Sequence, residues 1–152
     1  MTFNKLTWGV KASFRGYVEA AGGSITVSDG ATRTDDGAIV FNAIPGGDLS
    51  IASDGTATGS MKFEGTAVFE AHGGMLKSTL TELALEASDD GLLITVLEAP
   101  MNQSRCDIAK VTKIEIGSDN STSASTEITM DGMYQIADNY PPGTELDPLQ
   151  LD

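Results

Sequence analysis

Cysteine and histidine are the scarcest reactive side chains in this 152-residue sequence, which holds one of each, Cys106 and His72. A single cysteine excludes an intrachain disulfide, and the pair cannot supply the ligands of an ordinary zinc site. We expect Cys106 to be a buried, inert thiol. No run of 18 apolar residues is present, which excludes a membrane-spanning helix. The opening "MTFNKLTWGV" lacks the apolar core of a signal peptide.

Basic residues are also few, with 9 Lys and Arg against 22 Asp and Glu and a formal net charge of -13. Such a chain repels phosphates, so we expect no nucleic acid partner and no insertion into a membrane. The sequence as written reads as cytoplasmic, and an exported domain separated from its leader would read the same way. A P-loop, a nucleophile elbow and a dinucleotide fingerprint are all missing, which disfavours kinases, hydrolases and dehydrogenases.

What the sequence does contain is glycine, 17 residues of it, with Ser and Thr between short apolar runs. This composition is typical of β-structure with many turns. "GSMKFEGTAVFEAHGG" alternates best, and we expect Met61, Phe63, Gly65, Ala67, Phe69 and Ala71 to share one face. The same reasoning predicts strands within residues 23–30, 37–44, 47–53, 59–74, 75–88, 91–100, 105–117 and 118–130. In the long segment 75–88 the alternation of apolar residues changes phase near Thr81, as a β-bulge would cause. The turn-rich end, 139–152, is expected to be extended.

One helix is predicted, from about Trp8 to Ala21, with Thr7 as its cap and Gly22-Gly23 as its stop. Its inner face would hold Val10, Phe14, Tyr17 and Val18, with Ser13 beside Tyr17 on one side. The chain is therefore expected to form one domain, residues 1–152, of mainly β class: an antiparallel β-sandwich or barrel-like sheet with one N-terminal α-helix packed on it.

The segment "LTWGVKASFRGYV" resembles the opening motif of the HtaA domain, a heme-binding module of actinobacterial heme uptake. All fixed letters of that motif are present: Leu6, Trp8, Gly9, Val10, Lys11, Ser13, Phe14, Arg15 and Tyr17. Three further segments agree in order, "GGSITVSDGA", "MKFEGTAVFEAHGGMLKSTLTEL" and "DNYPPGTELDPL". Ala71 replaces the glycine that usually precedes the histidine. Members of the family are typically exported and anchored at the surface.

The resemblance implies that the ligand is ferric heme, with Tyr17 as the axial ligand of its iron, His72 in contact with that tyrosine, and Ser13 supporting the pocket. Phe63, Phe69 and Val68 could form an apolar groove. Lys11, Arg15 or Lys62 could meet the two propionates. Met75 could touch a ligand face. The role would be heme uptake, transfer or storage, with a heme donor or acceptor protein as partner.

The residues themselves leave two other functions open. The same pocket could serve a small cofactor-free cyclase, isomerase or lyase, in which Tyr17 acts as general acid, His72 as base and Ser13 as orienting group. The ligand would then be another small apolar molecule. Alternatively, the chain could be a structural domain without a site, because a tyrosine that faces a sheet from a helix is commonly part of a core.

Overall fold

The alternation within residues 59–74 decides where the core of the domain lies. The computed structural model describes residues 3–89, 91–97, 104–118, 121–136 and 140–152. All six positions expected on the inner face of that segment are buried: Met61, Phe63, Gly65, Ala67, Phe69 and Ala71. The positions between them are exposed or half-buried. This face joins one hydrophobic core that also includes Trp8, Phe14 and Phe41.

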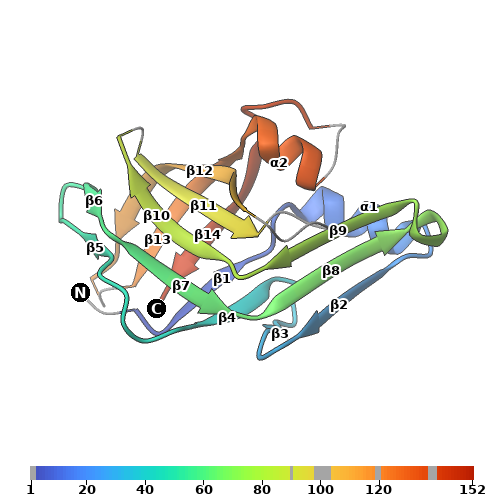
Figure 1. Cartoon of the computed structure of the whole chain (residues 1–152), viewed down its shortest axis with the longest axis horizontal. Helices are drawn as coiled ribbons and strands as arrows, with labels where there is room; N and C mark the ends of the chain where they lie inside the picture. The colour runs from blue at the N-terminus through green and yellow to red at the C-terminus, as the bar shows by residue number, and fades with distance from the viewer. Residues whose placement is uncertain (1–2, 90, 98–103, 119–120, 137–139) are drawn as a thin grey trace.

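The elements follow one another as two helices, one 3-10 turn and fourteen strands within the described residues (Figure 1). The first half holds β1 (Lys5–Trp8), α1 (Ala12–Ala20), β2 (Ser24–Ser28), β3 (Thr32–Arg33), β4 (Ile39–Ala43), β5 (Ser50–Ile51), β6 (Ala57–Thr58), β7 (Ser60–Glu64), β8 (Thr66–Ala71) and the turn η1 (His72–Gly74). The second half holds β9 (Leu76–Thr81), β10 (Ala84–Ser88), β11 (Gly91–Leu97), β12 (Arg105–Ile116), β13 (Thr122–Ile128), α2 (Met130–Gln135) and β14 (Glu145–Leu151).

The larger sheet closes on itself. Its order is β1-β14-β13-β12-β11-β10-β7-β4-β3, and β1 also pairs with β4. Leu6 lies opposite Leu151 on one side and opposite Phe41 on the other, so β1 seals the ring between the last strand and the fourth. All of these pairings are antiparallel. The prediction of a barrel-like antiparallel sheet with an N-terminal helix is confirmed.

A second, three-stranded sheet carries the region of interest. Its order is β2-β8-β9, and it extends beyond the closed sheet with α1 packed against β2 and β8 (Figure 1). Each of the two long predicted strands is divided where it passes from one sheet to the other. The first divides at Gly65, whose φ of 123° suits glycine, and the second at Glu82, whose φ is 51°. The phase slip expected near Thr81 is this passage between sheets, since β9 and β10 belong to different sheets.

The helix prediction was wrong at its start. Residues 5–8 form β1, and the helix begins at Ala12. Val10, placed on the helix by its spacing, precedes it and has a φ of 65° in a fully buried position. Local periodicity could not show this, because β1 is held by pairing with residues 39–42 and 150–151. Thr7 therefore lies in a strand and does not cap the helix.

Three smaller features differ from expectation or were not expected. The helix α2 was missed; the Thr129 hydroxyl caps it by accepting a hydrogen bond from the amide of Gly132. Cys106 is half-buried at the margin of the core on β12, not fully buried. The C-terminal segment is the long strand β14. Neither helix in the described part of the chain combines the length and hydrophobicity needed to cross a bilayer.

Candidate functional site

Tyr17 lies at the margin of the buried face of α1. Phe14 and Val18 are the buried residues of this helix, and they pack against the three-stranded sheet. Tyr17 follows Phe14 by three positions, which turns it about 60° away from Phe14, to the side opposite Val18. Its side chain is 49% exposed. We expected Tyr17 on the inner face, and the structure instead presents its ring to solvent.

His72 meets Tyr17 from the tip of the β8–β9 hairpin. Its Nε2 lies 2.5 Å from the hydroxyl oxygen of Tyr17, and the two ring centroids are 5.6 Å apart. The turn that carries His72 is left-handed, with φ of 55° at His72, 66° at Gly73 and 93° at Gly74. Histidine tolerates this region better than most residues, and the two glycines adopt it at no steric cost.

The chain after α1 can approach the hairpin closely because residue 23 is glycine. A Cβ at Gly23 would overlap the carbonyl oxygens of Glu70 and Val18. The amide of Gly23 donates to the carbonyl of Val18 and so closes the end of the helix. This contact brings the C-terminal end of α1 against the end of β8, next to His72.

One turn earlier on α1, Ser13 shares a hydrogen bond with Tyr140. The two hydroxyl oxygens are 3.1 Å apart. The Tyr140 ring meets Phe14 edge-on at 6.4 Å between centroids, and the Lys11 ammonium lies 5.8 Å from the centre of the same ring. Lys11 also donates to the carbonyl of Glu145. The place of Tyr140 beside Ser13 was not predicted from the sequence.

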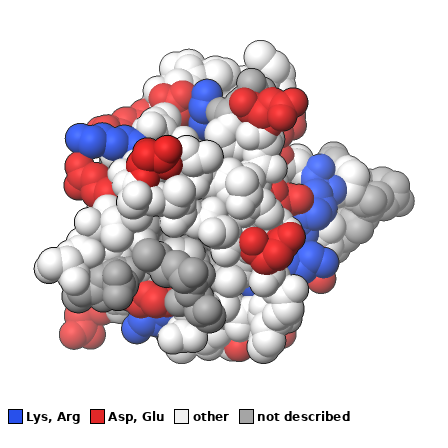
Figure 2. Space-filling view, turned by 90° about the vertical axis from the view of Figure 1, so that its left-hand side faces the viewer, with Lys and Arg blue, Asp and Glu red and all other residues white. Residues whose placement is uncertain are grey.

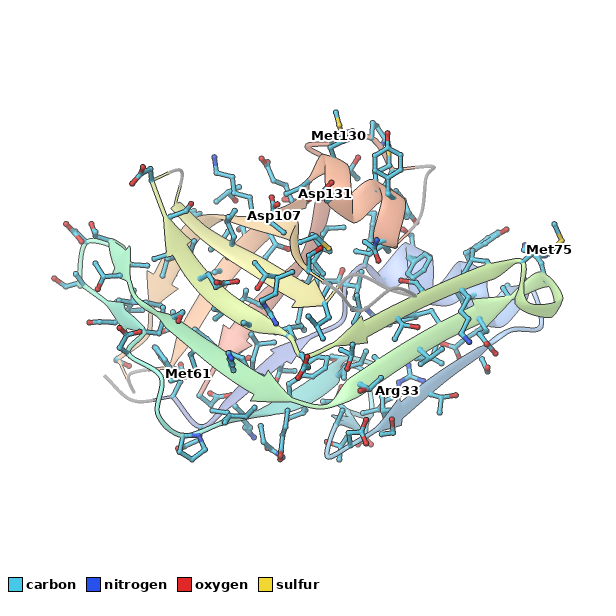
Figure 3. The ribbon with its side chains drawn as sticks, in the orientation of Figure 1. Arg33, Met61, Met75, Asp107, Met130 and Asp131 are labelled. Atoms are coloured by element: carbon cyan, nitrogen blue, oxygen red, sulfur yellow. The ribbon has the colours of Figure 1, made fainter. Side chains whose placement is uncertain are left out.

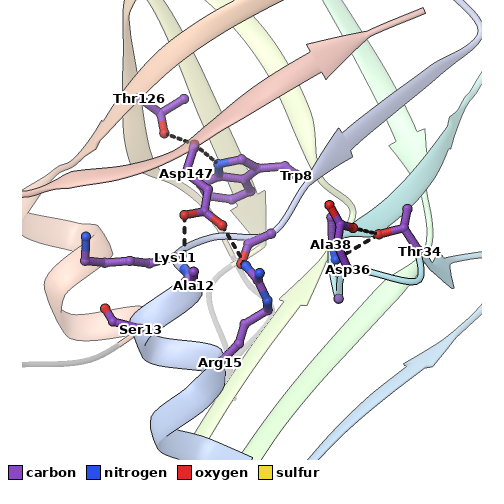
Figure 4. Close-up of polar contacts among 12 residues, drawn as sticks. Trp8, Lys11, Ala12, Ser13, Arg15, Thr34, Asp36, Ala38, Thr126 and Asp147 are labelled. Atoms are coloured by element: carbon purple, nitrogen blue, oxygen red, sulfur yellow. Dashed lines mark hydrogen bonds and ion pairs between the residues drawn. The ribbon is translucent and has the colours of Figure 1, made fainter.

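The guanidinium of Arg15 is held by hydrogen bonds within the protein. Its Nη1 donates to Asp147 Oδ2 at 2.6 Å and to the carbonyl of Gly9 at 2.7 Å, and its side chain is only 13% exposed (Figure 4). This arrangement leaves Arg15 less available to a propionate than its charge alone suggested. Nearby, hydrogen bonds from the Thr34 hydroxyl and the Ala38 amide hold the pKa of Asp36 below its ordinary value, with a smaller contribution from the charge of Arg15.

The other residues named from the sequence lie apart from this site. Phe63 and Phe69 are buried in the core and Val68 is half-buried, and of these three Phe63 lines a cavity, the one that also holds Lys62. Lys62 lines a cavity of about 640 Å³ where β7 gives way to β8. The six residues of β8, at about 3.3 Å each, place that cavity about 20 Å from His72. Met75 is at the hairpin tip and 92% exposed, with its side chain directed outward (Figure 3).

Comparison with known proteins decides the family, because the HtaA family model, described as Htaa, matches residues 4–152. The chain belongs to the HtaA family. The C-terminal domain of HtaA from Corynebacterium glutamicum has a similar structure, with a TM-score of 0.71, 28% identity, and coverage of 98% of this chain and 95% of that one. No curated protein matches the sequence.

Two further solved structures share the fold of this HtaA domain. The N-terminal domain of HtaA from the same organism has a TM-score of 0.73 and 23% identity, covering 99% of this chain and 96% of that one. The heme binding protein HtaB from that organism has a TM-score of 0.68 and 17% identity, covering 98% and 91%. At these identities the likeness establishes the architecture alone.

The HtaA domain has donors that fit an iron porphyrin. The phenol of Tyr17 is an oxygen ligand of the kind that binds heme iron in other proteins, and it is exposed enough to be reached. The imidazole at 2.5 Å can hold that oxygen in one orientation. The Ser13 and Tyr140 hydroxyls and the Lys11 ammonium lie toward the N-terminal end of the same helix and suit a carboxylate.

The overall negative charge of the chain makes the positive charge of Lys11 important for binding an anionic ligand. Figure 2, which views the end of the molecule that carries β5 and β6, shows acidic and basic side chains scattered over this face among uncharged ones. Other positive charges are engaged in ion pairs between exposed side chains, as for Lys77 with Glu70 and Lys113 with Glu115. In a chain of net charge -13, a ligand with two carboxylates depends on a nearby positive charge such as that of Lys11.

Proposed function

We propose that this HtaA domain binds one ferric heme on the exposed side of α1, with the Tyr17 phenolate as the axial ligand, for heme uptake, transfer or storage. The observation that carries the proposal is the pair formed by the Tyr17 hydroxyl and His72 Nε2. The membership of the family and the likeness to a protein named for heme binding support it.

In this proposal each residue has a defined task. Bound ferric iron supplies the positive charge that favours the deprotonated form of a phenol, whose ordinary pKa is about 10. His72 donates its Nε2–H to the resulting phenolate oxygen and so fixes its direction, while its left-handed turn keeps the ring over Tyr17. Ser13 and Tyr140 share one hydrogen bond, which leaves one of their two hydroxyl protons free to donate to a propionate, and Lys11 adds its charge.

The alternative function, a small enzyme with Tyr17 as acid and His72 as base, has less support from the cavities than heme binding has. The cavity beside His72 holds about 250 Å³ and is lined by residues 21–24 and 70–74, four of which are glycine. Tyr17 is not among its lining residues. A flat ligand lying against the exposed tyrosine fits this shape better than a small substrate enclosed between an acid and a base.

The test is a visible absorption titration of the protein with ferric heme, alongside Tyr17→Phe. We expect saturation at one equivalent with tyrosinate-to-iron charge-transfer bands, and loss of those bands in the variant. Tyr134→Phe is the matched control, because Tyr134 is 71% exposed on α2 and outside the site. A wild-type spectrum identical to that of free heme, or bands that persist in Tyr17→Phe, would refute the proposal.

A further inference from the structure

The Asp147 carboxylate is bonded on both of its oxygens to the segment that presents Tyr17. Oδ1 accepts the amide of Ala12 at 3.0 Å, and Oδ2 accepts Nη1 of Arg15 at 2.6 Å (Figure 4). Asp147 belongs to β14, 135 residues beyond Ala12. The last strand of the domain therefore reaches the first turn of α1 through this side chain.

The helix has no cap of its own. Lys11 is its N-cap residue and provides no side-chain hydrogen bond, and the first turn contains no acidic residue. Helix starts ordinarily satisfy their free amides with a nearby oxygen and favour negative charge there. Asp147 supplies both from outside the helix.

A second point of attachment fixes the rotation of the helix. Arg15 lies three residues after Ala12 and is held between Asp147 and the carbonyl of Gly9. A Cβ on Gly9 would overlap the guanidinium, so only glycine leaves room for it. Tyr17 follows Arg15 by two residues. A small rotation of α1 would therefore move the phenol away from His72.

The main chain of Asp147 is held separately. Its carbonyl accepts Trp8 Nε1 at 2.9 Å and the Thr126 hydroxyl at 2.7 Å, and its amide donates to the carbonyl of Val10 at 2.8 Å. A change confined to the carboxylate leaves these three bonds in place, so the strand can stay docked while the helix loses its cap.

We propose that Asp147 is a positioning residue for the heme ligand: its carboxylate sets the rotation of α1 and thereby holds the Tyr17 oxygen against His72. Nothing in the proposal requires Asp147 to touch the ligand. The expected effect of Asp147 on heme binding rests on the proposed function above. Its effect on the pair of Tyr17 and His72 does not.

Two single residues make the test direct, because His72 is the only histidine and Trp8 the only tryptophan. The ring nitrogens of His72 give one set of NMR signals, and Tyr17→Phe defines their position without the partner. In Asp147→Asn, measured at the same pH as the wild type, we expect these signals to move toward the Tyr17→Phe position. The Trp8 emission maximum should stay unchanged, since the carbonyl that it bonds is retained.

Thr126→Val is the matched control. It removes the hydroxyl bonded to the same main-chain carbonyl but leaves the carboxylate intact. It should lower the melting temperature without moving the His72 signals. His72 signals that stay at the wild-type position in folded Asp147→Asn, or that move equally in Thr126→Val, would overturn the proposal. If Asp147→Asn does not fold, Arg15→Lys tests the other end of the pair, because lysine keeps the charge but lacks the planar fork.

A second readout uses the heme-loaded protein with an excess of an apo-globin as acceptor. We expect Asp147→Asn to release heme about tenfold faster or more, as is usual when a residue behind a metal ligand is lost, with Thr126→Val close to wild type. Equal release rates in all three proteins would contradict the role of Asp147. Failure of the wild-type protein to bind heme would instead contradict the proposed function, while the His72 signals would still decide this inference.

Discussion

The hydroxyl of Tyr17 and Nε2 of His72 lie 2.5 Å apart although 55 residues separate them in the chain. One side chain comes from the helix and the other from the tip of a hairpin. The pair exists only when the helix is docked on the three-stranded sheet. The variants below test what each part of this arrangement contributes.

Replacing His72 should separate ligand binding from stability. His72→Gly removes a left-handed non-glycine residue, which relieves about 1 kcal/mol, and removes one hydrogen bond worth about the same amount. The melting temperature should therefore change little. Heme affinity should fall about 10- to 100-fold, because the phenolate loses the group that orients it. A heme titration and a thermal melt on the same sample measure both.

His72→Asn is the companion variant, because asparagine also tolerates the left-handed region and retains a hydrogen-bonding side chain. We expect an affinity between those of His72→Gly and the wild type. Equal affinities in all three proteins would show that His72 does not act on the ligand.

Ser13 and Tyr140 should matter only for a ligand with free carboxylates. Ser13→Ala and Tyr140→Phe each remove one hydroxyl of the pair at 3.1 Å, and Phe keeps the packing against Phe14. We expect each to weaken heme binding about fivefold, from about 1 kcal/mol per exposed hydrogen bond.

Titration with heme dimethyl ester, which lacks the carboxylates, provides the control for these two variants. Their losses should disappear with the ester. A loss of the same size with both ligands would mean that the hydroxyls support the fold and do not contact the propionates.

Reduction should weaken the complex. An anionic phenolate oxygen stabilises ferric iron more than ferrous iron, since the charge on the metal falls by one. We expect dithionite to accelerate transfer of heme from the loaded protein to an apo-globin, measured by absorption under nitrogen. An unchanged transfer rate would argue that the Tyr17 phenolate does not bind the iron in either oxidation state.

Two glycines next to the site should respond in opposite directions. Gly16 lies within α1 with open space around its Cα, so Gly16→Ala should stabilise the domain by about 0.5–1 kcal/mol. Gly23→Ala would place a Cβ against the main chain of β8 and should destabilise by about 1–3 kcal/mol or more. Denaturant unfolding measures both. Equal free energies for the two variants would mean that the helix does not approach β8 as closely as the structure shows.

Much of the sheet could be predicted from the sequence because its signal is local. The alternation from Met61 to Ala71 gave the correct inner face at every position. The division of the second long segment was signalled by the phase slip near Thr81, but the division of the first could not be predicted, since the alternation runs through Gly65 without a break. Which strands then pair, and that β1 closes the ring, are properties of contacts between distant segments.

The site was predicted less completely. Tyr17, His72 and Ser13 were named through the family resemblance, and spacing alone had placed Tyr17 on the buried face of the helix. The structure brings His72 to Tyr17 and places Ser13 one turn earlier on α1, while Lys62, Phe63 and Phe69 lie elsewhere. The start of the helix was wrong because its cap is Asp147, which no reading of residues 7–12 could reveal. Tyr140 was missed for the same reason: its partner Ser13 is 127 residues away.

The two sheets also differ in how easily each can open. Every strand of the closed ring has neighbours on both sides, whereas the sheet β2-β8-β9 ends in two outer strands and leans on one helix. Amide hydrogen exchange should therefore be fastest in β2, β9 and the hairpin tip, and slowest in β11–β13. His72 sits on the part that opens first. We expect a local opening of the hairpin to separate His72 from Tyr17 while the ring stays folded.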